Sequence, residues 1–430
     1  MASYMVWRSS IYSTLFVGYF LYYLNRKSFS FLMPYVIEEE GMNKSELGAI
    51  TSSISLAYTI SKFASGILSD KLSARIMFST GLMIASLLVL QFTSFNSMNA
   101  FMIIMFLNGL AQGGGWPGCS KILKKWFLPS ELGLWWSVLS TSANLAGVLG
   151  PICLALVAKE YGWRGAMNAG AILGIVWAVV SFLMIKNSPE DVGLQTLTDK
   201  DSQNNKVGPA KVQSSATTRD IIASPFLWIV SILFLLNAHI SYGIMDWGQL
   251  FLIQEVGFDN KVGSAFMSSY SIGAIVGSIA SGYVTDKLIA RASKQSKGSP
   301  RFIWFLIMEA VNLLFIHMFR TEVNLETSQV FLLLISFVMG VCQYSCFSVY
   351  GVVAIENAPA HLSGTSHAFA GMACNVGVLL AGFPLTYLAE MYNWGVVLMY
   401  LEIMSLASVF LLIVTRNADA RIGKSAKKLE

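Results

Sequence analysis

Charged residues are scarce in this sequence. Asp, Glu, Lys and Arg make up 12% of its 430 residues, whereas a soluble chain carries about 25%. Hydrophobic residues make up 55%, and the mean hydropathy is +0.59. These values exclude an ordinary soluble enzyme. They indicate a chain that lies mostly in lipid, where one helical span needs about 20 apolar residues.

Cysteine is also scarce, and no cysteine has a histidine or acidic residue at a metal-ligand spacing. The five cysteines all lie in apolar segments, so we expect reduced packing residues, no metal site and no cofactor. The net charge is only +5 and its basic residues are spread through loops, which excludes a nucleic-acid partner. The apolar run from Ile11 meets no small-residue cleavage site, so we expect it to be a retained first span.

Twelve apolar runs separated by polar turns predict an all-α membrane protein with twelve transmembrane helices in two six-helix bundles. We expect an N-terminal bundle at 1–186, a polar linker at 187–222, a C-terminal bundle at 223–416 and a tail at 417–430. The twelve runs lie near 9–35, 47–69, 76–95, 99–123, 132–158, 165–186, 224–252, 262–284, 302–320, 328–355, 363–389 and 394–415. Most of the 29 Lys and Arg residues fall in the two ends and the even-numbered loops. The positive-inside rule therefore predicts that both termini and the linker face the cytosol.

An internal repeat follows the same division. Residues 66–75 read GILSDKLSAR, and residues 282–291, 216 positions later, read GYVTDKLIAR. A second echo, at 231 positions, is made by three pairs of residues: Asn144 and Asn375, Tyr161 and Tyr392, and Trp163 and Trp394. Two echoes in order along both halves predict that the bundles are structural repeats.

The motif G-x-L-x-D-K-x-x-x-R after the second span resembles that of the major facilitator superfamily. The resemblance implies two six-helix bundles around a central cavity that opens alternately to each side of the membrane. We expect the motif to act as a gate through charges at the cytosolic ends of the helices. The alternative is that these are solvated loop charges. The gating candidates are Asp70, Arg75, Asp286 and Arg291.

Three cations lie inside predicted spans, where each is costly at the bilayer centre. Arg26 and Lys27 are adjacent in the first span and Lys62 is in the second. Helical spacing groups them with phenols, because Tyr19, Tyr22, Tyr23 and Arg26 share one stripe and Tyr58 precedes Lys62 by four residues. The inner stripes of these two helices carry no acid, so they predict an anion site in which Arg binds phosphate with two hydrogen bonds. The alternative for the two lysines is that they reach to the membrane interface.

Polar residues in the second half suggest partners for a sugar. His367 precedes Asn375 by eight residues on one helical face, and span 7 carries His239, Tyr242 and Asp246, followed by Trp247 and Gln249. An imidazole, an amide and an indole beside a cavity suit sugar hydroxyls or phosphate. The alternative for span 7 is a structural network between helices, and for His367 a structural buried histidine.

A more specific resemblance is carried by Gln112–Pro117, which reads QGGGWP, by Asn25–Lys27 and by Tyr58 with Lys62. These segments resemble the organophosphate:phosphate antiporters. The resemblance implies a phosphate site made of Arg26, Lys27, Lys62, Tyr58, Tyr23 and Trp116. It also supports a sugar site made of His367, Asn375, Tyr22, Asn144, Trp247, Gln249, Asp246 and His239.

Within that family the chain is similar to the endoplasmic-reticulum glucose-6-phosphate translocases, from about residue 8 to the C-terminus. The segments that carry this likeness include LYYLNRK at 21–27, FLIQE at 251–255 and GTSHA at 364–368. The resemblance implies exchange of cytosolic glucose 6-phosphate for luminal inorganic phosphate across the endoplasmic-reticulum membrane, feeding a luminal glucose-6-phosphatase. Lys427 and Lys428 match a K-K-x-x retrieval signal.

One departure from the family bears on the substrate. Related antiporters commonly place a second basic residue on span 7, where this chain has His239 and Ser241. An antiporter for another organophosphate, such as glycerol 3-phosphate, and a non-transporting sugar-phosphate sensor remain alternatives. An enzyme is not expected, because no nucleophile and base constellation is found.

Overall fold

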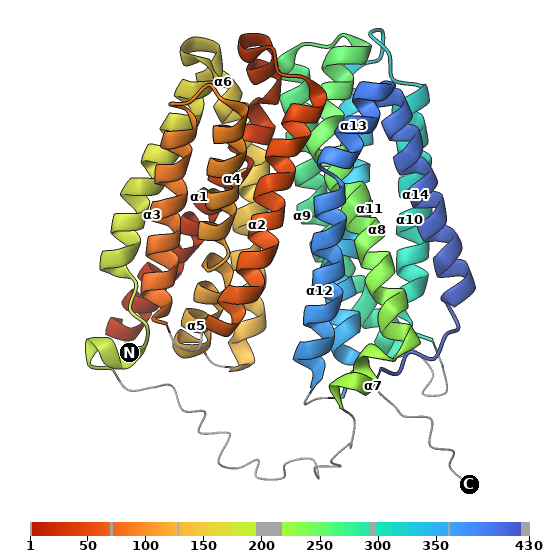
Figure 1. Cartoon of the computed structure of the whole chain (residues 1–430). Coiled ribbons are helices and arrows are strands. Elements are labelled where there is room, and N and C mark those ends of the chain that lie inside the picture. The colour runs from red at the N-terminus through yellow and green to blue at the C-terminus, as the bar shows by residue number, and fades with distance from the viewer. Residues whose placement is uncertain are drawn as a thin grey trace. The chain divides into compact units, whose positions relative to one another are not determined.

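The computed structural model describes residues 2–68, 72–127, 129–194, 217–291, 298–359 and 362–422 (Figure 1). These residues are helical or lie in turns, and no strand occurs among them. The chain divides into two compact units. Unit 1 comprises Met1–Met42 and Ala49–Val212, and unit 2 comprises Asn43–Gly48 and Gln213–Glu430.

Unit 1 contains six rod-like passes within its described residues. Four are formed by α1, α2, α3, and α4 with α5. The other two are the halves of α6, which are separated at Gly162, where φ is +69°. Only glycine adopts that angle without strain, so the chain turns there and starts a new pass at Trp163. The helices are α1 (Ala2–Glu40), α2 (Lys44–Leu68), α3 (Ala74–Phe92), α4 (Met98–Gln112), α5 (Gly115–Trp126) and α6 (Pro129–Met184), and a short 3-10 helix, η1 (Pro189–Val192), follows.

Unit 2 repeats this plan with six passes, of which the fifth is α12 continued by α13. The short helix α7 (Thr218–Ile222) precedes them, and a π-helical turn, η3 (Leu252–Val256), extends α8. The passes are α8 (Pro225–Phe251), α9 (Asn260–Arg291), α10 (Arg301–Thr321), α11 (Gln329–Glu356), α12 (Ser363–Leu380) with α13 (Phe383–Met391), and α14 (Trp394–Thr415).

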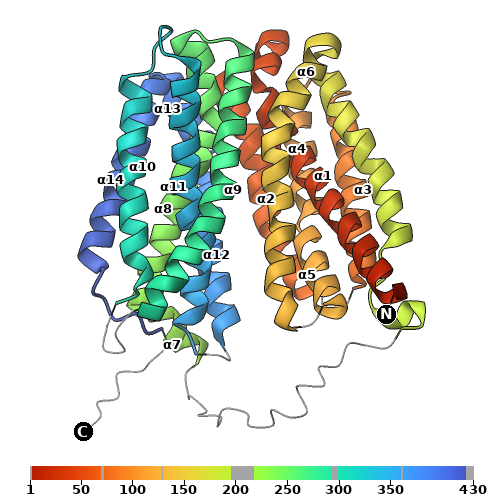
Figure 2. The ribbon, with the colours of Figure 1, turned by 180° about the vertical axis from the view of Figure 1, so that it is seen from behind.

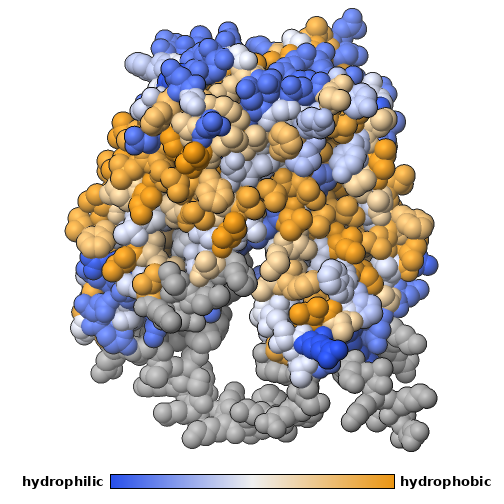
Figure 3. All heavy atoms as spheres, viewed as in Figure 1, coloured by the Kyte–Doolittle hydropathy of each residue, from blue (hydrophilic) through white to orange (hydrophobic). Residues whose placement is uncertain are grey.

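The helices carry the surface of a membrane protein. Eight helical stretches are long and apolar enough to cross a bilayer, and one of them, Val138–Met184, holds two passes. Large hydrophobic side chains are exposed along the helices, among them Ile103, Leu156, Ile279 and Phe410. Figure 3 shows hydrophobic residues over the middle of the helices and hydrophilic residues at their ends. The structure thus confirms the predicted all-α membrane architecture.

Glycines allow α9 and α11 to pack backbone against backbone. A Cβ at Gly273 would lie 2.1 Å from the Phe337 carbonyl oxygen, and one at Gly277 would lie 2.2 Å from that of Val341. Small residues four apart are the usual means of such close helix packing in membranes. Figure 2 shows α9, α11 and α10 running alongside one another in unit 2. This close packing fixes the positions of α9 and α11, two of the helices that carry polar residues of unit 2.

Candidate functional site

Unit 1 brings together the predicted phosphate-binding residues of α1 and α2. The guanidinium carbon of Arg26 lies 4.4 Å from the centroid of the Tyr58 ring and 5.2 Å from that of Tyr23. Arg26 is half-buried, and Tyr23 is buried. The ring faces attract the cation and orient it. Arg26 is thus held by aromatic groups from two helices.

Two lysines add positive charge to the same two helices. The Lys62 ammonium group lies 5.8 Å from the Tyr58 ring centroid and its side chain is exposed. Lys27 is buried, with 8% of its surface exposed. The stretches 5–37 of α1 and 49–68 of α2 contain no acidic residue. Three cations on two helices without acids on the same stretches favour an anion as their ligand.

Trp116 extends the aromatic surface on the same side of α1. Its ring centroid lies 4.8 Å from that of Tyr19 and 4.9 Å from that of Trp136, and both pairs meet edge to face. Tyr22 lies differently, since its hydroxyl donates to the Phe78 carbonyl at 2.7 Å and its ring packs against Phe78. The structure therefore joins Tyr23, but not Tyr22, to Arg26, and uses Tyr22 to tie α1 to α3.

The predicted sugar residues of unit 2 fall into two groups, and the first lies on α12. His367 is exposed, and its Nδ1 lies 3.3 Å from the Gly351 carbonyl oxygen of α11. Asn375, eight residues further along α12, is half-buried. In unit 1 the repeat-related Asn144 is likewise half-buried, on α6. These side chains retain exposed polar atoms that can bind a ligand.

The second group lies on α8, and its side chains make contacts inside the helix bundle. His239 is 3% exposed, its Nδ1 lies 3.4 Å from the Gly377 carbonyl oxygen, and its ring meets the Tyr400 ring edge to face. The Trp247 indole donates to the Ala381 carbonyl at 2.6 Å and stacks on Trp394. These are interhelical packing contacts. Asp246 and Gln249 on the same helix are buried as well.

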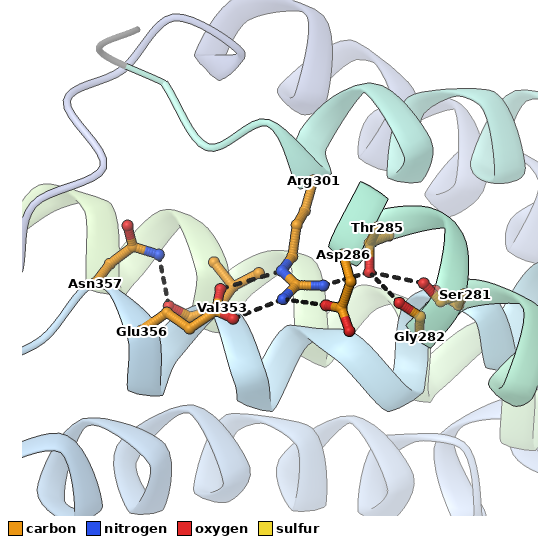
Figure 4. Close-up of polar contacts among 8 residues, drawn as sticks. All are labelled: Ser281, Gly282, Thr285, Asp286, Arg301, Val353, Glu356 and Asn357. Atoms are coloured by element: carbon orange, nitrogen blue, oxygen red, sulfur yellow. Dashed lines mark hydrogen bonds and ion pairs between the residues drawn. The ribbon is translucent and has the colours of Figure 1, made fainter. Parts of the chain in front are cut away.

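An ionic cluster at the ends of three helices of unit 2 surrounds Arg301, the first residue of α10 (Figure 4). Its guanidinium donates to both carboxylate oxygens of Glu356, at 3.1 and 2.6 Å, and to Asp286 at 3.0 Å. A further N–H donates to the Thr285 hydroxyl. The Arg301 side chain is only 4% exposed. The cluster joins the end of α9, the start of α10 and the end of α11.

Two of the gating candidates, Asp286 and Arg291, do not pair with each other. Arg291 is exposed at the last residue of α9, and Asp286 pairs with Arg301 instead. Residues five apart on a helix do not face each other, whereas Arg301 enters from the neighbouring helix. In unit 1, Arg75 donates to the Phe182 carbonyl at 2.6 Å. Asp70 lies outside the described residues.

Arg301 could not be predicted from the sequence, because no partner for it is visible along the chain. Its partners are 15 and 55 residues away, and no motif spans that distance. The only available signal was a basic residue at the start of an apolar run.

Comparison with known proteins places the chain in one family. The family model described as Major Facilitator Superfamily matches residues 15–382. A probable hexose phosphate transport protein of Chlamydia pneumoniae is 30% identical over 98% of this chain and 94% of its own length. The membrane sensor protein UhpC of Escherichia coli K12 is 27% identical over 97% and 94%, and the glycerol-3-phosphate transporter of Bacillus subtilis 168 is 27% identical over 98% and 95%.

A solved structure agrees in fold. The inward-facing structure of a bacterial homologue of the human lysosomal transporter Spinster superposes with a TM-score of 0.71 over 95% of each chain, at 14% sequence identity. At that identity the likeness concerns the fold alone.

Proposed function

Because the chain belongs to the major facilitator superfamily, we propose that it exchanges a sugar phosphate, glucose 6-phosphate, for inorganic phosphate across the membrane. The chain is a membrane transporter and not an enzyme. The observation that carries the proposal is the position of Arg26 between Tyr58 and Tyr23, with Lys62 near the same Tyr58 ring.

Arg26 is suited to the phosphate group of either substrate. A guanidinium presents two parallel N–H donors to two phosphate oxygens, and the lysines add point charge. Closure around the site without an anion would bring cations together and desolvate them, which is unfavourable. The empty carrier therefore returns slowly and the loaded carrier returns fast, so exchange dominates over net uptake.

The choice of a hexose follows from the relatives and from α12. The Chlamydia relative is named as a hexose phosphate transport protein, and the exposed imidazole of His367 with the half-buried amide of Asn375 can bond sugar hydroxyls. The resemblance of residues 21–27 and 364–368 to the endoplasmic-reticulum translocases supports residence in that membrane, and the distribution of Lys and Arg supports cytosolic termini. There the carrier would supply a luminal glucose-6-phosphatase.

Uptake of labelled glucose 6-phosphate into proteoliposomes tests the proposal. We expect trapped phosphate to stimulate uptake strongly, and unlabelled glucose 6-phosphate outside to compete better than glycerol 3-phosphate. Uptake without stimulation by phosphate would contradict exchange. Better competition by glycerol 3-phosphate would replace the substrate by that of the Bacillus relative.

A sensor is the second candidate, because the Escherichia coli relative is named as a membrane sensor protein. A sensor binds the sugar phosphate without moving it. Binding detected by stabilisation of the purified protein, together with no uptake in phosphate-loaded or phosphate-free vesicles, would establish it in place of the transporter.

A further inference from the structure

A buried polar cluster lies between three helices of unit 2, apart from the residues assigned above. Its members are Asn237 and Ser241 on α8, Glu309 and Asn312 on α10, and Gln343 on α11, and each is at most 1% exposed. The Asn237 amide donates to Glu309 at 3.1 Å and to the Gln343 side-chain oxygen at 2.7 Å. The Ser241 hydroxyl donates to that same Gln343 oxygen at 2.8 Å. The carboxyl group is thus tied directly to α8 and, through Asn237, to α11.

Several atoms of this cluster have no hydrogen-bond partner among the described residues. They are Glu309 Oε2, Asn237 Oδ1, Gln343 Nε2 and both polar atoms of the Asn312 amide. Asn312 follows Glu309 by three residues on α10, so both side chains lie on one helix face. Buried polar groups are normally hydrogen-bonded, and the unpaired atoms of Glu309, Asn237 and Gln343, three side chains linked by hydrogen bonds, indicate a site that takes up a further group.

No basic side chain pairs with Glu309 among the described residues. The basic residues of α10 lie at its ends, where Arg301 binds Glu356 and Asp286, and Arg320 with His317 binds Glu402 of α14. Cys342, Cys346 and Tyr350 of α11 and Tyr270 of α9 lie close enough to Glu309 to interact with it electrostatically, and none of them carries a positive charge.

The titratable groups of α8 are His239, Tyr242 and Asp246. The His239 ring contacts Gly377 and Tyr400, and neither the Tyr242 phenol nor the Asp246 carboxyl group offers a positive charge to Glu309. An ionised carboxylate at Glu309 would therefore be buried at membrane depth without a counter-charge, which is strongly unfavourable. A neutral carboxylic acid avoids this cost.

The atoms without hydrogen-bond partners show which ligand suits this cluster, a proton or a metal cation. A hard cation such as Na⁺ requires a shell of oxygen ligands, but two of the atoms without a partner are the amide nitrogens of Asn312 and Gln343. A proton on Glu309 Oε2 instead converts an unpaired acceptor into a donor. It can then bond an unpaired amide oxygen of Asn312 or Asn237. The chemistry of the cluster thus favours a proton as its ligand.

We propose that Glu309 is a proton-binding site, occupied in the conformation described here and emptied when the surrounding helices rearrange during transport. The inference rests on the proposed transport function and extends it, because it makes the exchange cycle dependent on a proton. At high pH a carrier that has lost this proton must bury a carboxylate again, and its cycle slows. The amide of a Glu309→Gln variant mimics the protonated acid and escapes this effect.

The experiment compares homologous exchange of glucose 6-phosphate by wild type and E309Q, with equal pH on both sides of the vesicle. Both proteins meet the same substrate, so titration of the substrate phosphate cancels in the ratio of their rates. We expect a ratio near one at about pH 5.5 and a wild type slower by about threefold or more at about pH 8.5. Asn312→Ala, which keeps the carboxyl group, should retain a pH-dependent ratio to E309Q. A ratio that is constant over this range would overturn the proposal.

A second readout does not depend on transport. The infrared spectrum of the purified wild type should contain a carboxylic-acid C=O band that is missing from E309Q and disappears at alkaline pH. A band absent at every pH, or one that persists at every pH, would overturn the proposal. If the wild type exchanges no organophosphate, the proposed function fails while this spectrum still decides the proton site. Glu309→Met serves in the same comparisons if E309Q is not recovered as folded protein.

Discussion

The carboxylate of Glu255 accepts a hydrogen bond from the backbone N–H of Trp394, the first residue of α14. Its second oxygen accepts from the N–H of Gly395 at 2.9 Å. The Asn393 side chain accepts from Val396, so three of the four free N–H groups at this helix start are satisfied. Glu255 thus joins the end of the first pass of unit 2 to the start of its last.

Unit 1 contains the same arrangement. Glu39, 216 positions before Glu255, accepts from the backbone N–H of Trp163 at 3.3 Å. Trp163 precedes Trp394 by 231 positions, which is the second spacing of the sequence repeat. In each unit, one hydrogen bond therefore joins a glutamate that recurs after 216 positions to a tryptophan that recurs after 231 positions.

We predict that Glu255→Gln destabilises the protein, because the substitution removes a negative charge from a helix N-terminus and weakens two hydrogen bonds. A helix cap contributes about 0.5–2 kcal/mol, so the midpoint of thermal unfolding in detergent should fall by a few degrees. Glu326→Gln, at an exposed loop residue, is the matched control. An equal fall in both variants would show that the cap contributes nothing of its own.

Arg26→Ala should abolish phosphate-dependent exchange while leaving the protein folded in the membrane. Loss of two charge-assisted hydrogen bonds to phosphate, each worth about 1.5–3 kcal/mol, lowers the exchange rate by about 100-fold or more. Arg26→Lys keeps the charge without the paired donors, so an intermediate rate is expected. Arg219→Ala, at an exposed position on α7, should exchange like the wild type. Near-normal exchange by Arg26→Ala would remove the central residue of the proposed site.

The sequence predicted those features that a single helix reveals. A cation in an apolar run is visible without a structure, and this identified Arg26, Lys27 and Lys62. The stripe of Tyr22 and Tyr23 was less informative. Tyr22 and Tyr23 lie three and four residues after Tyr19, so both belong to one broad face of α1. That face is wide enough for the Tyr22 ring to reach α3 while the Tyr23 ring reaches Arg26.

Contacts between helices could not be predicted in the same way. Arg301 meets Glu356 across 55 residues, and Asn237 meets Glu309 across 72. Neither separation follows a helical period, because each depends on which helices are neighbours and on their rotation. The acid at Glu309 was visible as a charge in a span, but its partners and its unpaired oxygen required the packed bundle.

Gly273→Ala should destabilise unit 2 strongly. The new Cβ would lie 2.1 Å from the Phe337 carbonyl oxygen and 2.9 Å from its carbon, and a helix backbone cannot yield as a side-chain tip can. Overpacking of this kind costs about 1–3 kcal/mol or more. The control is Gly282→Ala on the same helix, where a Cβ would meet nothing within 4 Å. Thermal unfolding should show a lower midpoint for Gly273→Ala only, and similar midpoints for both variants would contradict this packing.

Acid should weaken unit 1 at the ion pair of Glu40 and Arg164. The hydrogen bond from Arg164 lowers the pKa of the Glu40 carboxyl below its usual value. The pair therefore stabilises the fold fully above that usual value, about 4.3, and its contribution is lost as the pH falls through the lowered pKa. The unfolding midpoint should fall on acidification below about pH 4.5, and less steeply in Glu40→Gln. The exposed Glu38→Gln variant should fall like the wild type; an equally shallow fall there would contradict the assignment to Glu40.

The ionic cluster of unit 2 should depend more on Glu356 than on Asp286. Arg301 donates two hydrogen bonds to Glu356 and one to Asp286, and the Asp286 side chain is 72% exposed against 38% for Glu356. Solvent screens the more exposed pair more strongly. Glu356→Gln should therefore lower the free energy of unfolding by about 1 kcal/mol, and Asp286→Asn by less.

A double-mutant cycle measures this pair directly. Arg301→Gln combined with Glu356→Gln should cost less than the sum of the two single changes, because each single change already removes the same interaction. Arg291→Gln, at the exposed last residue of α9, should leave the free energy of unfolding within about 0.5 kcal/mol of the wild type. Additive costs for Arg301 and Glu356, or a larger cost at Arg291, would mean that the ends of α9, α10 and α11 are held together by other contacts.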